Sequence, residues 1–150
     1  MYTPKRFSID KALVNDNENA ARSAYQRKDY VSCFLLIHSI VEALLRAFLT
    51  KTRQERFADL ITAYEKYLQQ EGQTRSTFVD ELIKFNQRRN RIIHELWEKG
   101  YSATNNISEP ACRVAFIIYG LLIEWLETFQ PEITNFGFEY DKPTQDGLSP

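Results

Sequence analysis

The stretch at residues 85–96 concentrates the side chains best suited to chemistry. Its sequence, FNQRRNRIIHEL, places Arg88, Arg89 and Arg91 within about one helical turn, and His94 follows shortly after. An imidazole moves protons near neutral pH, as a general acid or base must. A guanidinium offers planar donors to phosphate and stabilises negative charge that develops there. Together these groups suit cleavage of an RNA phosphodiester, in which the ribose 2′-hydroxyl attacks and no metal ion is needed.

A helix over this stretch gathers its polar groups on one surface. Side chains at i, i+3, i+4 and i+7 share a helical face, and the residues with that spacing are Gln87, Asn90, Arg91 and His94. Arg89 lies to one side of this face, but its long guanidinium can reach a phosphate near His94. The amide of Asn90 can orient either of these two groups.

Each of these residues also has an interpretation without chemistry. The helix dipole favours a histidine near the C-terminal end of a helix, which by itself accounts for His94. Lys84, Arg88 and Arg91 are more often solvated surface charges than ligands. In the functional interpretation these three bind the phosphates of the substrate, and Arg89 is the arginine that we favour for the reaction itself.

A second polar group lies within an apolar segment at residues 30–50. His38 and Glu42 are one helical turn apart, and Arg46 follows one turn later. The three side chains can form a hydrogen-bonded ladder that is satisfied within the core or at its edge. In the functional alternative, His38 or Glu42 lies behind His94 and sets the tautomer of that imidazole.

Apolar spacing and helix-end signals predict the elements that must position these residues. Five helices are expected, at residues 10–28, 30–50, 54–70, 77–97 and 108–130. The second is apolar on most sides and is expected at the centre. The fifth has two apolar sides, so it is either central or half of a dimer interface. The predicted fold is all-α, an antiparallel bundle of about five helices with a polar loop at residues 102–106.

The chain of 150 residues fits a single domain. Its core is expected at about residues 10–130, and residues 131–150 are expected to form an irregular, extended tail. Only five Gly and five Pro are present, which is little turn punctuation for a β-rich fold. The aromatic residues, Trp97 and Trp125 among them, are expected in the core.

Composition and charge exclude several classes of protein. A net charge of −1 argues against a protein held to nucleic acid by bulk electrostatics. Cys33 and Cys112 are expected to be buried free thiols, and with the two histidines they match no paired zinc-ligand spacing, so no metal is expected. The N-terminus lacks the apolar core of a signal peptide, and the longest apolar run, residues 114–126, is too short to cross a bilayer. A cytoplasmic protein without membrane contact is therefore expected.

Residues 89–94, RNRIIH, resemble the signature of the HEPN superfamily. That signature is an arginine, usually a polar residue, a few further residues and then a histidine. The helix order is similar as well, with long helices before the helix that bears the motif and a very apolar helix after it. The second predicted helix also resembles its HEPN counterpart through Ser39, Glu42, Leu45 and Arg46.

The resemblance implies a metal-independent endoribonuclease without a cofactor that acts as a homodimer, in which two copies of the motif meet across the two-fold axis. Arg89 and His94 then match the catalytic pair, and Asn90 matches the polar residue after the arginine. Many members are bacterial toxins or abortive-infection factors, so RNA and an antitoxin or other neighbouring-gene protein are the implied partners. Leu96 stands where toxins encoded beside nucleotidyltransferase antitoxins usually carry Tyr, so we do not expect regulation through modification of that side chain.

The alternative function is a HEPN-like domain without catalysis, which binds a nucleotide or a protein, or serves for dimerisation. The near-neutral net charge mildly favours this alternative, because RNA-processing surfaces are usually more basic.

Overall fold

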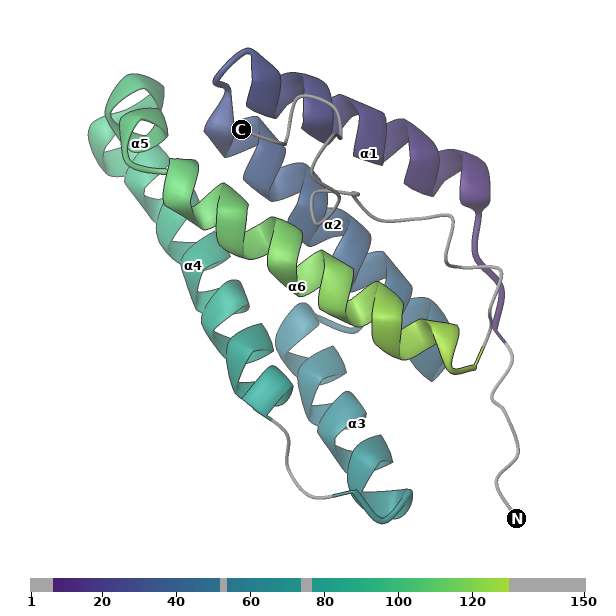
Figure 1. Ribbon diagram of the computed structural model, residues 1–150. Coiled ribbons are helices and arrows are strands. Elements are labelled where there is room, and N and C mark those ends of the chain that lie inside the picture. The colour runs from purple at the N-terminus through teal and green to yellow at the C-terminus, as the bar shows by residue number, and fades with distance from the viewer. Residues whose placement is uncertain (1–6, 52–53, 74–76, 130–150) are drawn as a thin grey trace.

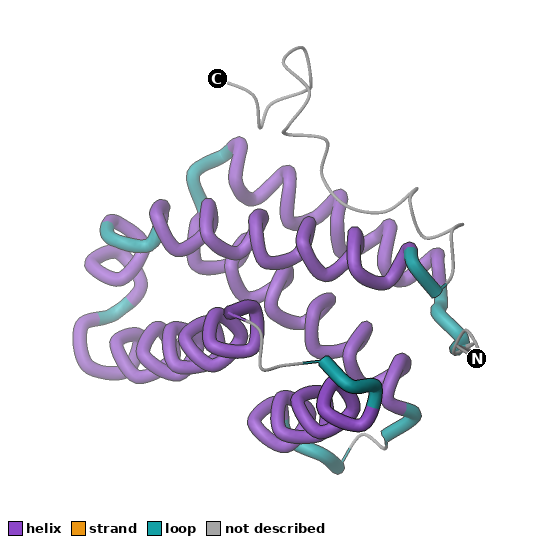
Figure 2. Tube along the Cα trace, turned by 60° about the horizontal axis from the view of Figure 1, so that its bottom comes forward, coloured by secondary structure: helices purple, strands orange, loops and turns teal. Residues whose placement is uncertain are grey.

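The computed structural model describes residues 7–51, 54–73 and 77–129. Over these ranges the chain forms α-helices and no strand, which confirms the all-α prediction (Figures 1 and 2). The helices are α1 (Lys11–Gln26), α2 (Tyr30–Leu49), α3 (Phe57–Gln70), α4 (Thr77–Lys99), α5 (Tyr101–Asn106) and α6 (Glu109–Glu127). The tail predicted at residues 131–150 lies outside the described residues.

Helix α2 is the centre of the bundle, as its apolar composition predicts. It contacts every other described helix, and Figure 1 shows α6 lying across it with α1 alongside. Its length and mean hydropathy also meet the criteria for a membrane span, but the central helix of a folded domain meets the same criteria. More than half of its most apolar window, 56%, is buried inside the bundle.

Aspartate caps begin the first two helices. The carboxylate of Asp10 accepts a hydrogen bond from the Leu13 backbone N–H at 3.1 Å, and that of Asp29 accepts one from the Ser32 backbone N–H at 3.3 Å. Such caps satisfy backbone donors that a helix leaves without partners in its first turn. The two caps therefore fix where α1 and α2 start, and α1 and α2 form a helical hairpin.

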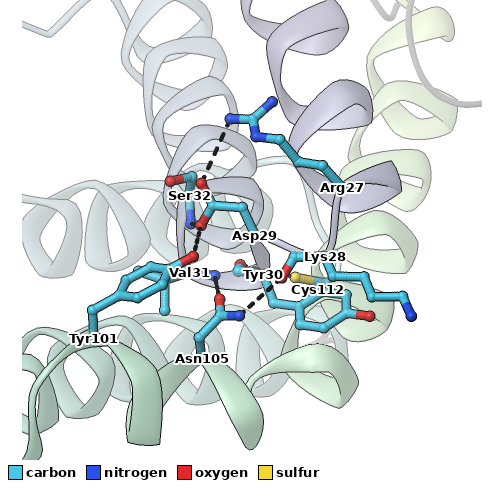
Figure 3. Close-up of polar contacts among 9 residues, drawn as sticks. All are labelled: Arg27, Lys28, Asp29, Tyr30, Val31, Ser32, Tyr101, Asn105 and Cys112. Atoms are coloured by element: carbon cyan, nitrogen blue, oxygen red, sulfur yellow. Dashed lines mark hydrogen bonds and ion pairs between the residues drawn. The ribbon is translucent and has the colours of Figure 1, made fainter.

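The prediction of a polar loop at residues 102–106 is wrong, because these residues belong to the short helix α5. Gly100, at φ +84°, separates α4 from α5. Asn105 then binds the α1–α2 turn twice: its Oδ1 accepts from the Val31 N–H at 3.0 Å, and its Nδ2 donates to the Lys28 carbonyl at 2.8 Å (Figure 3). The Tyr101 hydroxyl donates to Asp29 Oδ1 at 2.6 Å. A helix this short has no readable apolar period, so only its tertiary contacts reveal it.

Helix α6 is apolar on two sides, and the two sides have different surroundings. One side packs on α2 and is buried, including Ala115 and Leu122. The other side presents a stripe to solvent, with Val114 47%, Ile117 49% and Leu121 44% exposed. The buried side therefore fits the expected central position of α6, and the exposed side fits the alternative expectation of a dimer interface.

Most aromatic residues of the described chain are buried or half-buried, but Trp97 and Tyr101 are exposed. Trp125 packs against Phe48, Tyr64 and Phe129 at ring-centroid distances of 4.8, 5.0 and 4.8 Å. Trp97 and Tyr101, by contrast, are 88% and 49% exposed, so the prediction of a core position is wrong for these two residues. Trp97 lies one turn after Ile93, on the side of α4 that faces solvent. The helical period alone does not tell whether a residue at this position is exposed or lies at the border of the core.

Cys33 and Cys112 are free and buried, as predicted. The Cys112 thiol donates to the Tyr30 carbonyl at 3.1 Å, which links α6 to the start of α2. A hydrogen bond to Cys33 and burial both raise the pKa of the Cys112 thiol. Both thiols are therefore part of the packing between α2 and α6.

Candidate functional site

Helix α4 carries the whole motif and is anchored by one apolar side. Its buried residues are Val79, Leu82, Phe85 and Ile92, while Arg88, Arg89, Asn90, Arg91 and His94 are exposed. The helix predicted around the motif is therefore confirmed, and it presents the polar groups on the surface of the bundle.

The consecutive arginines Arg88 and Arg89 line different cavities on two sides of α4. Arg89 lines a cavity of about 370 Å³ with His38, Glu42, Arg56, Phe57, Ala58, Asn86 and Asn90. Arg88 lines a smaller cavity of about 180 Å³ whose walls include Lys84 and the α6 residues Ala111 and Val114. The two guanidinium groups therefore serve different surfaces, although they are neighbours in the sequence.

The structure joins Arg89 and Asn90 directly. Arg89 Nη1 donates a hydrogen bond to Asn90 Oδ1 at 3.2 Å. Both side chains line the same cavity, so this bond joins two neighbouring residues of its wall. An orienting role of the Asn90 amide stays a prediction.

His94 lies elsewhere on the helix. Its side chain is 72% exposed, and its Nε2 is 3.1 Å from Glu98 Oε2, one turn further along α4. Five helical residues correspond to a rotation of about 140°, so Arg89 and His94 leave α4 in different directions. His94 is not among the residues that line the Arg89 cavity, and in the described part of one chain the two side chains do not share it.

The remaining cations of the motif are exposed. Lys84 Nζ is 3.5 Å from Glu81 Oε2, an exposed pair between residues three positions apart on α4. Arg91 is exposed as well. Both are placed where a bound polyanion can reach them, and both equally fit the alternative of solvated surface charges.

His38 lines the Arg89 cavity and is only 3% exposed. Its ring packs against Phe57 and Phe85 with centroid distances of 4.6 and 4.8 Å. Burial lowers the pKa of His38 to about 4, the positive charge of Arg89 acts in the same direction, and a hydrogen bond with Asn86 opposes them. His38 is therefore neutral at physiological pH, and its buried Nε2 has no hydrogen-bond partner among the described residues.

Glu42 and Arg46 form part of the ladder expected on α2. Arg46 Nη2 donates to Glu42 Oε2 at 2.8 Å and also to the Glu55 carbonyl at 2.8 Å. His38 and Glu42 both line the cavity of Arg89, whereas the described partner of His94 is Glu98. The structure thus brings His38 and Glu42 to the arginine of the motif and not to its histidine.

Sequence reasoning missed two polar residues of this cavity, Arg56 and Asn86. Asn86 is at i, i+3 and i+4 spacing with Arg89 and Asn90, so the helical period was a signal that could have found it. Arg56 precedes α3, far from the motif in sequence, and only the packing of α3 against α2 and α4 brings it there. No spacing signal of the sequence links Arg56 to Arg89. Among the residues that the structure describes, no group of three or more His, Cys, Asp or Glu side chains is placed to hold a metal ion.

No family model, curated protein or solved structure matches this chain. The HEPN resemblance therefore rests on the motif at residues 89–94 and on the order of the helices around it.

Proposed function

We propose that the protein is a metal-independent endoribonuclease of HEPN type that acts as a homodimer in the cytoplasm. The observation that carries the proposal is the placement of Arg89, Asn90 and His94 on one exposed helix, with Arg89 held by Asn90 at 3.2 Å. All three side chains are open to a substrate as large as RNA.

In the proposed reaction, the ribose 2′-hydroxyl loses its proton to a base and attacks the adjacent phosphorus. The bond from phosphorus to the 5′-oxygen breaks, and an acid supplies the proton that this oxygen needs. His94 acts as the acid or the base, and Arg89 stabilises the negative charge of the phosphorane-like transition state. The products are a 2′,3′-cyclic phosphate and a 5′-hydroxyl end.

Dimerisation is part of this proposal because Arg89 and His94 leave α4 in different directions. Two copies of α4 that meet across a two-fold axis can bring His94 of one copy toward Arg89 of the other. The exposed apolar residues on α4 and α6 offer surface for such a contact: Trp97, Val114, Ile117 and Leu121. As in many proteins with this motif, a toxin or defence role with a neighbouring-gene partner fits the proposal.

The test is incubation of the purified protein with single-stranded RNA, with and without EDTA. Cleavage is expected to survive the chelator and to leave cyclic phosphate ends. His94→Ala is expected to lower the rate at least about 100-fold, the lower range for loss of a general acid or base. Because His94 is exposed, the variant is expected to keep the circular dichroism spectrum and melting temperature of the wild type. Undiminished cleavage by folded His94→Ala would exclude His94 as the acid or base.

A non-catalytic binding or dimerisation module is the second candidate. It is favoured by the position of His94 outside the Arg89 cavity and by the exposed apolar stripe of α6. This candidate predicts a stable dimer in analytical ultracentrifugation together with RNA that stays intact at every protein concentration.

A further inference from the structure

The cavity beside Arg89 has three walls from different parts of the chain. His38 and Glu42 come from α2, Asn86 and Asn90 come with Arg89 from α4, and the third wall is the start of α3. It encloses about 370 Å³ and is lined largely by polar side chains. A polar cavity of this size at the junction of three helices is large enough to hold a small ligand.

The charge that lines this cavity is positive. Arg56 and Arg89 both border it, and among the described residues no carboxylate forms an ion pair with Arg89. Arg56 Nε is 3.7 Å from Asp59 Oδ2, the Arg56 backbone N–H donates to the same oxygen at 3.3 Å, and the Arg56 side chain is 85% exposed. Among the described residues, Glu42 is the one carboxylate that lines the cavity, and it pairs with Arg46 at 2.8 Å. A surplus of guanidinium charge therefore remains for a ligand.

The start of α3 adds backbone donors to the same space. Phe57 and Ala58 are the first two residues of this 14-residue helix, and both line the cavity. Backbone N–H groups in the first turn of a helix have no partner within the helix, and the helix dipole favours an anion there. Guanidinium groups and a helix N-terminus thus converge on one volume.

His38 supplies an independent sign that a ligand belongs there. Buried polar atoms are nearly always hydrogen-bonded, and those that are not call for an explanation such as an absent ligand. The Nε2 of His38 is such an atom, on a side chain that is 3% exposed and lines the cavity. It can accept a hydrogen bond from a protonated phosphate oxygen or a ligand hydroxyl. When the imidazole takes up a proton, it can donate to a phosphate oxygen instead.

We propose that this cavity is a binding site for a phosphate group, held by Arg56, Arg89 and the N-terminus of α3, with His38 Nε2 as its innermost hydrogen-bond partner. The group is either inorganic phosphate or the terminal monophosphate of a nucleotide or RNA end. The planar guanidinium donors and the helix N-terminus are both suited to a compact oxyanion. The site does not depend on His94 or on cleavage of RNA, so it goes beyond the proposed nuclease.

The first experiment follows the histidine ring nitrogens by ¹⁵N NMR while inorganic phosphate is added to the full chain. Saturable movement of the His38 Nε2 resonance is expected, and the His94 resonances serve as the internal reference. Adenosine 5′-monophosphate and adenosine are titrated in parallel. Tighter binding of the monophosphate than of inorganic phosphate identifies a nucleotide phosphate as the ligand, and equal binding identifies the free ion. No saturable movement of His38 with any of the phosphates overturns the proposal.

The second experiment compares arginine variants by isothermal titration with the same ligands. Arg56→Ala and Arg89→Ala are each expected to weaken binding at least about tenfold, the loss typical of one charge-assisted hydrogen bond. Arg27→Ala is the matched control, because Arg27 is an exposed arginine at the end of α1 and does not line the cavity, and the affinity of this variant is expected to stay within about twofold of the wild type. Equal affinities for all three variants overturn the proposal.

Arg56→Ala also separates this proposal from the nuclease. Arg56 has no part in the proposed reaction, so the variant is expected to lose phosphate binding while RNA cleavage persists. His94→Ala is expected to show the opposite pattern, with phosphate binding intact and cleavage lost. Failure of one proposal therefore leaves the other measurable.

Discussion

At the scale of single residues, His38 combines burial with a nitrogen that has no hydrogen-bond partner among the described residues. Its neutral imidazole packs against Phe57 and Phe85 and lines a cavity that two arginines border. The sequence pattern gives His38 the same face as Glu42, and that prediction is confirmed by their shared cavity. The pattern does not predict that Arg89, on another helix, lies near His38. Its positive charge lowers the pKa of His38 and so helps to keep the imidazole uncharged.

The depressed pKa of His38 predicts a specific dependence of stability on pH. The pKa falls from 6.5 to about 4 in the folded protein, so between these values the unfolded chain binds a proton that the folded chain does not. The free energy of unfolding therefore decreases as the pH falls from 6.5 to 4. At about 1.4 kcal/mol per pKa unit, the loss attributable to His38 is about 3 kcal/mol.

Urea denaturation at pH 7 and pH 4.5 measures this loss. His38→Phe keeps an aromatic ring between Phe57 and Phe85 and removes the titrating group, so its stability is expected to fall much less on acidification than that of the wild type. His94→Ala is the control, and it is expected to keep the pH dependence of the wild type. If the wild type and His38→Phe lose the same stability, the imidazole does not titrate as described.

At the scale of helices, the long amphipathic elements were predictable and the short connection was not. Helices α2, α3, α4 and α6 show apolar residues at helical spacing over several turns, so their existence follows from the sequence alone. Helix α5 has six residues and one buried side chain, Thr104, which is too little for a period. Arg56 joins the cavity for a similar reason, because helix packing brings it there and no local spacing encodes that contact.

The contacts of α5 predict that Asn105 holds the α1–α2 hairpin in place. Asn105→Ala removes two hydrogen bonds, to Val31 N–H and to the Lys28 carbonyl, and is expected to lower the free energy of unfolding by about 1–3 kcal/mol. Asn106→Ala is the matched control at the next, exposed position and is expected to change stability by less than about 0.5 kcal/mol. Thermal or urea unfolding of the two variants checks the difference. Equal stability of the two variants would show that the two hydrogen bonds of Asn105 do not stabilise the fold.

At the scale of the whole molecule, the exposed stripe of α6 is an apolar surface that continues along one helix through Val114, Ile117 and Leu121. Leu121 of the stripe also lines an apolar cavity of about 330 Å³ with Tyr64, Leu68 and Trp125. A bundle whose last described helix is apolar on both sides has a surface suited to a second copy, which the proposed composite nuclease site requires.

A charge in the middle of this stripe is expected to prevent the proposed homodimer. Ile117→Lys places an ammonium group between Val114 and Leu121, where a second copy has to bury it at high cost. Sedimentation velocity is expected to show a dimer for the wild type and a monomer for Ile117→Lys, with RNA cleavage lost in parallel. Leu13→Lys is the matched control, because Leu13 is an exposed leucine on α1, at 59%, away from the stripe. A dimer that persists in Ile117→Lys rules out this face as the contact.

The central position of α2 also has a consequence for biosynthesis. Helix α2 is the most apolar of the described helices. It packs extensively against α6, which is the last of the described helices to be synthesised. While the chain emerges from the ribosome, α1 can shield one side of α2 at once, but the side that meets Cys112 and its neighbours stays bare until α6 arrives. The nascent chain therefore exposes this apolar side of α2 until α6 has been synthesised, and exposed apolar surface of this kind favours aggregation.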